Sequence, residues 1–121
     1  MKSILIIDDE EDILDFMTEV LSNEGYKIIP VSSGESAISL MEHNIPDLIL
    51  LDLRLQGMSG LEFLKLLKSD ERLSKIPVII VTCKTEIRDK ILGLQGGAID
   101  YISKPFTHEK LIKRVKAILG E

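Results

Sequence analysis

The stretch Ile4-Leu5-Ile6-Ile7-Asp8-Asp9-Glu10-Glu11-Asp12 joins four apolar residues directly to five consecutive carboxylates. A short apolar run rich in β-branched residues is typical of a buried strand. Acids favour the positive end of a helix dipole, so the start of a helix explains Glu10, Glu11 and Asp12 as well as any binding role does. It explains Asp8 and Asp9 poorly, because they abut the strand itself. These two residues therefore indicate a site that needs negative charge.

Similar apolar runs alternate with amphipathic segments along the whole chain. The first, third and fourth runs are almost continuous Ile, Leu and Val, which indicates strands buried on both faces of a parallel sheet. The second run is weaker and the fifth is more polar, which favours edge positions. The predicted strands are Ser3 to Ile7, Lys27 to Val31, Asp47 to Leu51, Pro77 to Val81 and Ala98 to Ile102.

Apolar stripes at helical spacing lie between these runs, and we expect all of them to face the core. Ser59 to Glu62 forms a capping-box pattern at the start of one helix, and Gly25 and Gly96-Gly97 are stop signals. The stripes are Ile13, Met17, Val20 and Leu21; Ala37, Ile38, Leu40 and Met41; Leu61, Leu64 and Leu67; Ile87, Ile91 and Leu94; and Leu111, Ile112, Val115, Ile118 and Leu119.

Five alternating strand–helix units in 121 residues predict a single α/β domain over residues 1–121, with a doubly wound open sheet. An eight-fold barrel would need about 250 residues. The net charge of -5 argues against general nucleic-acid binding, and the lone Cys83 excludes a disulfide framework. The first apolar run is too short for a signal peptide or a membrane span, so we expect a soluble cytoplasmic protein.

Ligands of open α/β sheets bind beyond the carboxyl ends of the strands. Asp8 and Asp9 end the first predicted strand, Asp52 ends the third and Thr82 ends the fourth. Lys104 follows the fifth. Any one of these residues has a structural explanation, such as a cap or a solvated lysine, but together they predict one site at this edge of the sheet.

The predicted cluster of carboxylates favours a divalent cation. Carboxylates about 5 Å apart repel by roughly 3 kcal/mol per pair at an effective dielectric of about 20. Mg²⁺ is bound by few carboxylates and keeps positions free for phosphate oxygens. Asp52 could then act as a nucleophile that forms an acyl phosphate, with Thr82 and Lys104 as the remaining donors.

The sequence resembles the response regulator receiver domain family over its whole length. The motifs that carry the resemblance occur in the family's order: Ile6 to Glu10, Asp47 to Leu53, Gly57 to Gly60, Val78 to Thr82 and Gly97 to Phe106. The resemblance implies a flavodoxin-like fold of five strand–helix units with strand order 2-1-3-4-5.

The resemblance also implies roles for individual residues. Asp52 would accept a phosphoryl group from a sensor histidine kinase or phosphotransfer protein, with Mg²⁺ or Mn²⁺ as cofactor. Its metal ligands would be Asp9, Asp52 and the backbone carbonyl of Arg54, with Asp8 acting through water. Thr82 and Lys104 would hold the phosphoryl oxygens. Tyr101 would be the switch aromatic, and Pro105 would follow a cis bond.

By the same resemblance, the protein would catalyse its own phosphorylation and dephosphorylation and pass the signal to an effector. The output face would be formed by the fourth helix, the fifth strand and the fifth helix. Direct contact with nucleic acid or membrane is not expected.

Three alternatives remain at the level of sequence. A flavin mononucleotide carrier would place its phosphate beside Asp8 and Asp9, which would repel it. A dehalogenase-type phosphatase needs a second aspartate two residues after the first, where this chain has Arg54. The third alternative is a binding module of the same fold that works without phosphorylation.

Two basic residues near the predicted site have an open role. Arg54 lies two residues after Asp52, and Lys84 lies two residues after Thr82. Either side chain could lean over the opening of the site and slow the loss of phosphate. They could equally well pair with Glu10 and Glu86.

Overall fold

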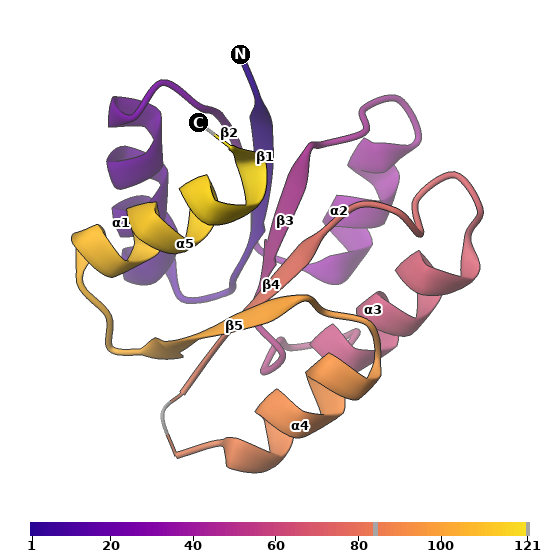
Figure 1. Ribbon diagram of the computed structural model, residues 1–121. Helices are drawn as coiled ribbons and strands as arrows, with labels where there is room; N and C mark the ends of the chain where they lie inside the picture. Colours follow the sequence, from indigo (N-terminus) through magenta and orange to yellow (C-terminus); the bar gives the residue numbers. More distant parts are fainter. Residues whose placement is uncertain (84, 121) are drawn as a thin grey trace.

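The computed structural model describes residues 1–83 and 85–120, and a parallel five-stranded sheet lies at its centre (Figure 1). The strand order is β2-β1-β3-β4-β5, so the parallel sheet and the order implied by the resemblance are confirmed. The weaker second and more polar fifth strands lie at the edges, as predicted. The strands are β1 (Ser3–Ile7), β2 (Lys27–Val31), β3 (Leu48–Leu51), β4 (Val78–Cys83) and β5 (Asp100–Lys104).

Strand boundaries differ from the prediction mainly in the second half of the chain. β4 continues to Cys83, so Thr82 lies inside the strand and pairs in register with Ser103 of β5. β5 begins only at Asp100, because the N–H of Ala98 still donates to the Gly93 carbonyl at the end of the preceding helix. Lys104 is consequently the last residue of β5 rather than a residue beyond it.

Helices cover both faces of the sheet (Figure 1). α1 (Glu11–Asn23) and α5 (His108–Leu119) pack on one face, and α2 (Gly34–Met41), α3 (Gly60–Ser69) and α4 (Ile87–Gln95) lie on the other. Apolar side chains between sheet and helices form two buried clusters, one for each face. We call these the α1/α5 layer and the α2–α4 layer.

The predicted helix signals mostly have the expected geometry. Ser59 and Glu62 form both hydrogen bonds of a capping box at the start of α3. Gly25 and Gly97 have φ angles of 91° and 112°, which favour glycine and stop the helices before them. Glu11 and Asp12 lie in the first turn of α1, but Glu10, at its N-cap position, makes no side-chain cap hydrogen bond.

The prediction that every apolar stripe faces the core is wrong for α4. Ile87, Ile91 and Leu94 are 64%, 51% and 41% exposed. The buried face of α4 carries Gly93 and Asp89 instead. A Cβ on Gly93 would lie 1.8 Å from Cδ1 of Ile80, so the missing side chain is what lets α4 approach the sheet. This packing turns the apolar stripe outward.

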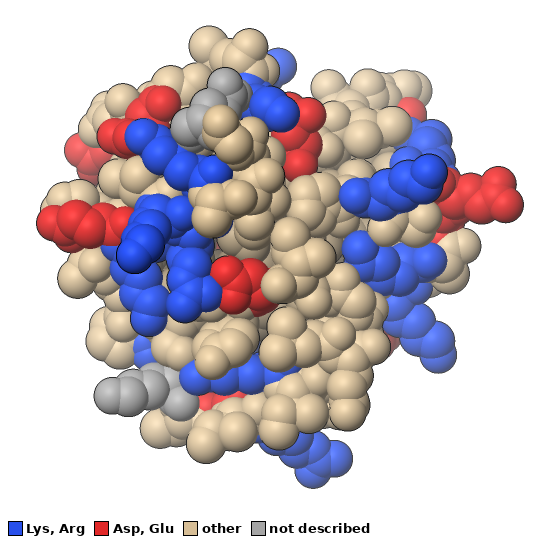
Figure 2. Space-filling view, viewed as in Figure 1, with Lys and Arg blue, Asp and Glu red and all other residues tan. Residues whose placement is uncertain are grey.

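The charge of the surface is uneven. Lys and Arg gather over α5, which carries Lys110, Lys113, Arg114 and Lys116, and the surface over α4 is mostly uncharged (Figure 2). The protein therefore has a locally basic face despite its net charge of -5. None of the helices in the described part of the chain combines the length and the apolar character needed to cross a membrane.

Candidate functional site

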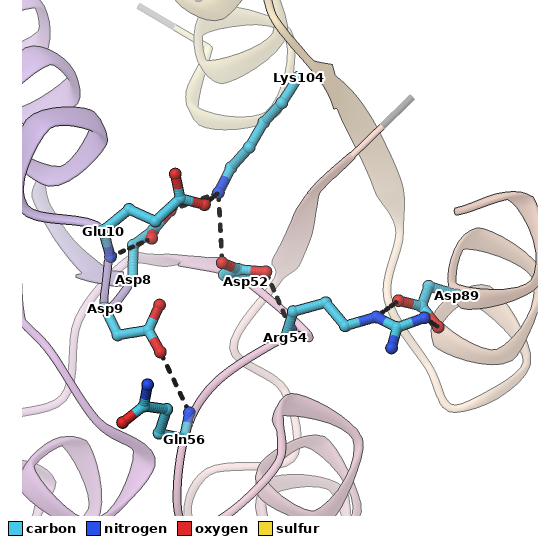
Figure 3. A network of polar contacts seen from close by, with 8 residues as sticks. All are labelled: Asp8, Asp9, Glu10, Asp52, Arg54, Gln56, Asp89 and Lys104. Carbon is cyan, nitrogen blue, oxygen red and sulfur yellow. Dashed lines mark hydrogen bonds and ion pairs between the residues drawn. The ribbon is translucent and has the colours of Figure 1, made fainter. Parts of the chain in front are cut away.

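The residues predicted to form one site come together at the carboxyl edge of the sheet. Asp8 follows β1, Asp52 follows β3, and Lys104 ends β5, so three of the five strands bring side chains to this edge (Figure 3). Asp8 is fully buried and Asp52 is 3% exposed. Ionised carboxylates are rarely buried unless they are paired, so the site must supply them with partners.

The ammonium group of Lys104 is the partner that these carboxylates share. Its Nζ donates to Oδ2 of Asp52 at 3.2 Å and to Oε1 of Glu10 at 3.1 Å. It also lies 3.0 Å from Oδ2 of Asp8, as an ion pair without hydrogen-bond alignment. Lys104 thus offsets part of the mutual repulsion of three carboxylates.

The buried position of Asp8 changes its protonation. Burial raises the pKa of Asp8 to about 6, although the backbone N–H of Glu10 and the ammonium of Lys104 act in the opposite direction. Burial alone would lower the pKa of Lys104, but the close contact with the Asp8 carboxylate and the charges of Asp52 and Asp8 outweigh it and raise that pKa. Lys104 is therefore fixed as a cation, and Asp8 is the carboxylate that most needs further positive charge.

Backbone amides orient the carboxylates of this edge. The N–H of Glu10 donates to Oδ1 of Asp8, and the N–H of Arg54 donates to Oδ1 of Asp52, both at 2.9 Å. The carboxylate of Asp9 accepts a hydrogen bond of 3.1 Å from the N–H of Gln56. The loop after β3 is in this way tied to both acidic strand ends.

The carboxylate group best placed to hold a metal differs partly from the expected one. Oxygens of Asp8, Glu10 and Asp52 all lie within 4.8 Å of one another, and Asp9 does not belong to this group. Glu10 was missed as a site residue because its position beside a helix start explained it equally well. Three carboxylates so close together fit a hard divalent cation, which prefers oxygen ligands.

Thr82 provides an independent sign that the site receives a further group. Its hydroxyl oxygen is buried and has no hydrogen-bond partner among the residues that the structure describes. A buried unpaired hydroxyl costs about 1–3 kcal/mol, so such groups are usually explained by a missing ligand or a functional role. A group bound beside Asp52 that offers acceptor oxygens would satisfy it.

The other two predicted residues lie near the fifth strand. The ring of Tyr101 is half-buried against the α2–α4 layer, and Nζ of Lys90 lies 4.7 Å from its centroid. The peptide bond between Lys104 and Pro105 is cis, as the resemblance implies.

Arg54 does not lean over the opening of the site. Its side chain runs away from Asp52 to α4, where Nε donates to Oδ2 of Asp89 at 2.7 Å (Figure 3). Nη2 pairs with Glu86, the N-cap residue of α4. The hydrogen bond to Asp89 also raises the pKa of Arg54. Of the two alternatives for Arg54, the structure shows the pair with Glu86, and Lys84 lies outside the described residues. Asp89 was missed because the wrong orientation predicted for α4 placed it toward solvent.

Comparison with known proteins gives a consistent picture. The family model of the response regulator receiver domain matches residues 4–116. The phosphate regulon transcriptional regulatory protein PhoB of Klebsiella pneumoniae is 40% identical over 118 residues, which are 98% of this chain and 52% of that protein. The chain thus spans about half the length of the curated relatives it matches.

Solved structures agree with the match. A crystal structure of a protein described as a response regulator from Chloroflexus aurantiacus aligns with a TM-score of 0.94 at 32% identity, covering 99% of this chain and 98% of that one. The receiver domain of the sensor histidine kinase PA1611 from Pseudomonas aeruginosa, with a magnesium ion coordinated in its active-site cleft, aligns with a TM-score of 0.90 at 27% identity. The two coverages are again 99% and 98%.

Because the receiver-domain match covers nearly the whole chain, it argues against a flavin carrier and against a dehalogenase-type phosphatase. This chain belongs to the response regulator receiver domain family.

Proposed function

We propose that the protein is a phosphorylation-activated switch in which Asp52 accepts a phosphoryl group from a sensor histidine kinase or phosphotransfer protein. The observation that carries the proposal is the set of groups around the Asp52 carboxylate. A nearly buried carboxylate lies 3.2 Å from a lysine ammonium, in a site that also contains an unpaired buried hydroxyl. Acceptor oxygens of a phosphoryl group would use both donors.

The transfer step needs no additional reactant. A carboxylate oxygen of Asp52 attacks the phosphorus of a phosphohistidine, and the new O–P bond forms as the N–P bond breaks. The imidazole leaves with the electron pair and takes a proton from solvent. Lys104 neutralises charge on the phosphoryl oxygens. Hydrolysis by water then returns the free carboxylate and inorganic phosphate.

The carboxylates beside Asp52 support Mg²⁺ or Mn²⁺ as the cofactor. Asp8, Glu10 and Asp52 would hold the ion, with Asp9 and the carbonyl of Arg54 as the ligands that the family implies. When bound, the ion neutralises charge on the phosphoryl oxygens and on the carboxylates. The magnesium in the related PA1611 receiver domain supports this assignment.

The output of the switch lies on the face formed by α4, β5 and α5. Thr82 lies on β4 and Tyr101 on the neighbouring strand β5. A movement of Thr82 toward the phosphoryl group would therefore change the space available to the Tyr101 ring. The exposed apolar residues of α4 suit contact with a downstream effector protein or domain. We place this function in the cytoplasm, without direct contact of this domain with nucleic acid or membrane.

The proposal is tested by phosphorylation with acetyl phosphate and Mg²⁺, followed by intact mass and phosphate-affinity electrophoresis. We expect one added phosphoryl group, which is lost in Asp52→Asn and in excess EDTA. Asp12→Asn, which changes an exposed carboxylate of α1, is the matched control and should label normally. Full labelling of Asp52→Asn would contradict the proposal. Absence of labelling in every protein would favour a binding module that works without phosphorylation.

A further inference from the structure

Arg54 connects the candidate phosphorylation site to α4. Its backbone N–H donates to Oδ1 of Asp52 at 2.9 Å, and its side chain reaches Asp89 in the opposite direction. Figure 3 shows Arg54 between these two carboxylates. The same residue therefore touches the phosphoryl acceptor with its backbone and a helix of the output face with its guanidinium.

The two ends of the Arg54–Asp89 contact differ in exposure. The side chain of Asp89 is 10% exposed and lies on the face of α4 that packs toward the protein, whereas the side chain of Arg54 is 61% exposed. Both oxygens of Asp89 accept from Arg54, at 2.7 Å from Nε and 3.5 Å from Nη2. Asp89 is thus the packed end of the contact, and the Arg54 side chain is the end with open space around it.

We propose that Asp89, assisted by Glu86, is a positioning residue that holds the Arg54 guanidinium on α4 and away from a phosphoryl group on Asp52. The inference rests on the proposed function, because it concerns the lifetime of the phosphorylated state. Neither acidic residue touches Asp52, so both act only through Arg54.

The Asp89 carboxylate and a phosphoryl group on Asp52 would compete for the guanidinium of Arg54. A guanidinium binds phosphoryl oxygens through two parallel hydrogen bonds, as it binds carboxylates. If Arg54 is released from Asp89, its backbone still lies beside Asp52 and its guanidinium could turn toward the phosphoryl group. There it would occupy the approach of the hydrolytic water. Asp89 therefore keeps the phosphoryl group accessible to water and shortens the signal.

The test is the half-life of the phosphorylated protein with Mg²⁺ after the donor is removed, in a double-mutant cycle. Asp89→Asn in the natural sequence should lengthen the half-life at least about threefold, because the charge that holds Arg54 is lost. The same substitution in an Arg54→Ala background should leave the half-life of that background unchanged. The ³¹P resonance of the acyl phosphate should shift on Asp89→Asn only when Arg54 is present.

Further variants separate positioning from a general loss of structure. Asp89→Glu keeps the charge and should restore the half-life, and Glu86→Gln, which changes a less buried residue, should lengthen it by a smaller factor. Glu24→Gln breaks the ion pair of 2.8 Å between the C-cap residue of α1 and Lys116 of α5, remote from the site, and serves as the matched control. An unchanged half-life in Asp89→Asn, or an equal change with and without Arg54, would overturn the inference. Absence of labelling in the unsubstituted protein would instead overturn the proposed function.

Discussion

At the scale of single residues, Asp8 carries the greatest electrostatic cost of the site. It is fully buried, its Oδ2 has only an unaligned ion pair with Lys104, and burial raises its pKa to about 6. A buried carboxylate with so little support lowers the free energy of unfolding whenever it is ionised. The metal-free protein thus keeps a destabilising charge where a cation would be held.

This cost predicts a pH dependence with a definite sign. The folded protein holds the Asp8 proton more tightly than the unfolded chain, so the contribution of Asp8 to metal-free stability falls as the pH rises from 3.8 to about 6. Above that range, Asp8→Asn should raise the free energy of unfolding by about 1–3 kcal/mol in EDTA. Urea denaturation at several pH values measures it.

The exposed Asp12→Asn is the control for this experiment and should change stability by less than about 0.5 kcal/mol. The gain of Asp8→Asn should shrink toward zero near pH 4. A gain that is equal at pH 4 and pH 7, or a loss at pH 7, would show that Asp8 is not ionised at a cost in the folded protein.

Sequence alone identified the site residues that end apolar strands but not those whose partners come from distant elements. Asp8 and Asp52 were predictable because each directly follows a buried strand, and Lys104 because it lies at the carboxyl end of the fifth strand. Glu10 was ambiguous, since a helix start and a pair with Lys104 need the same residue type. Asp89 was beyond reach, because its role depends on the side of α4 that faces the sheet.

At the scale of elements, α4 shows why an apolar stripe does not always mark a buried face. The other four stripes predicted the packed faces of their helices correctly, except for Ile112 of α5, which belongs to neither apolar cluster. Helix faces usually bury their largest apolar area. In α4 the close approach of the backbone at Gly93 decides the orientation, and the stripe is left exposed. A glycine within a helical pattern was the available signal.

Gly93→Ala tests this account of α4. Alanine favours a helix by about 1 kcal/mol over glycine, but the new Cβ would lie 1.8 Å from Cδ1 of the buried Ile80. Overpacking of a core costs about 1–3 kcal/mol, so we expect a net loss of stability in urea denaturation.

The companion variant Gly93→Ala with Ile80→Val removes the clashing Cδ1 atom. It should be more stable than the sum of the two single substitutions predicts, because each change relieves the other. Strict additivity, or a gain in stability from Gly93→Ala alone, would mean that the contact with Ile80 does not set the position of α4.

At the scale of the whole molecule, one sheet is shared by two apolar layers. Successive residues of β1 alternate between them, with Leu5 and Ile7 in the α2–α4 layer and Ile4 and Ile6 in the α1/α5 layer. β3 and β4 alternate in the same way. Because neither layer keeps a partner if the sheet is lost, we expect both to unfold together.

The two tyrosines and the absence of tryptophan make this expectation measurable. Tyr26 is buried in the α1/α5 layer, and Tyr101 packs against the α2–α4 layer. Tyr101→Phe leaves Tyr26 as the fluorescent reporter, and Tyr26→Phe leaves Tyr101. In each variant the urea midpoint from fluorescence should coincide with that from circular dichroism. Separate midpoints within one variant would show that one layer unfolds before the other.

The strand order also determines how the sheet ends. β2 and β5 each leave one side without a neighbouring strand, and an exposed edge is a template for strand addition by another chain. In β2 that edge contains Pro30, which has no N–H to donate, and β5 carries charged Asp100 and Lys104. Both ends of the sheet therefore resist cross-β aggregation with other chains.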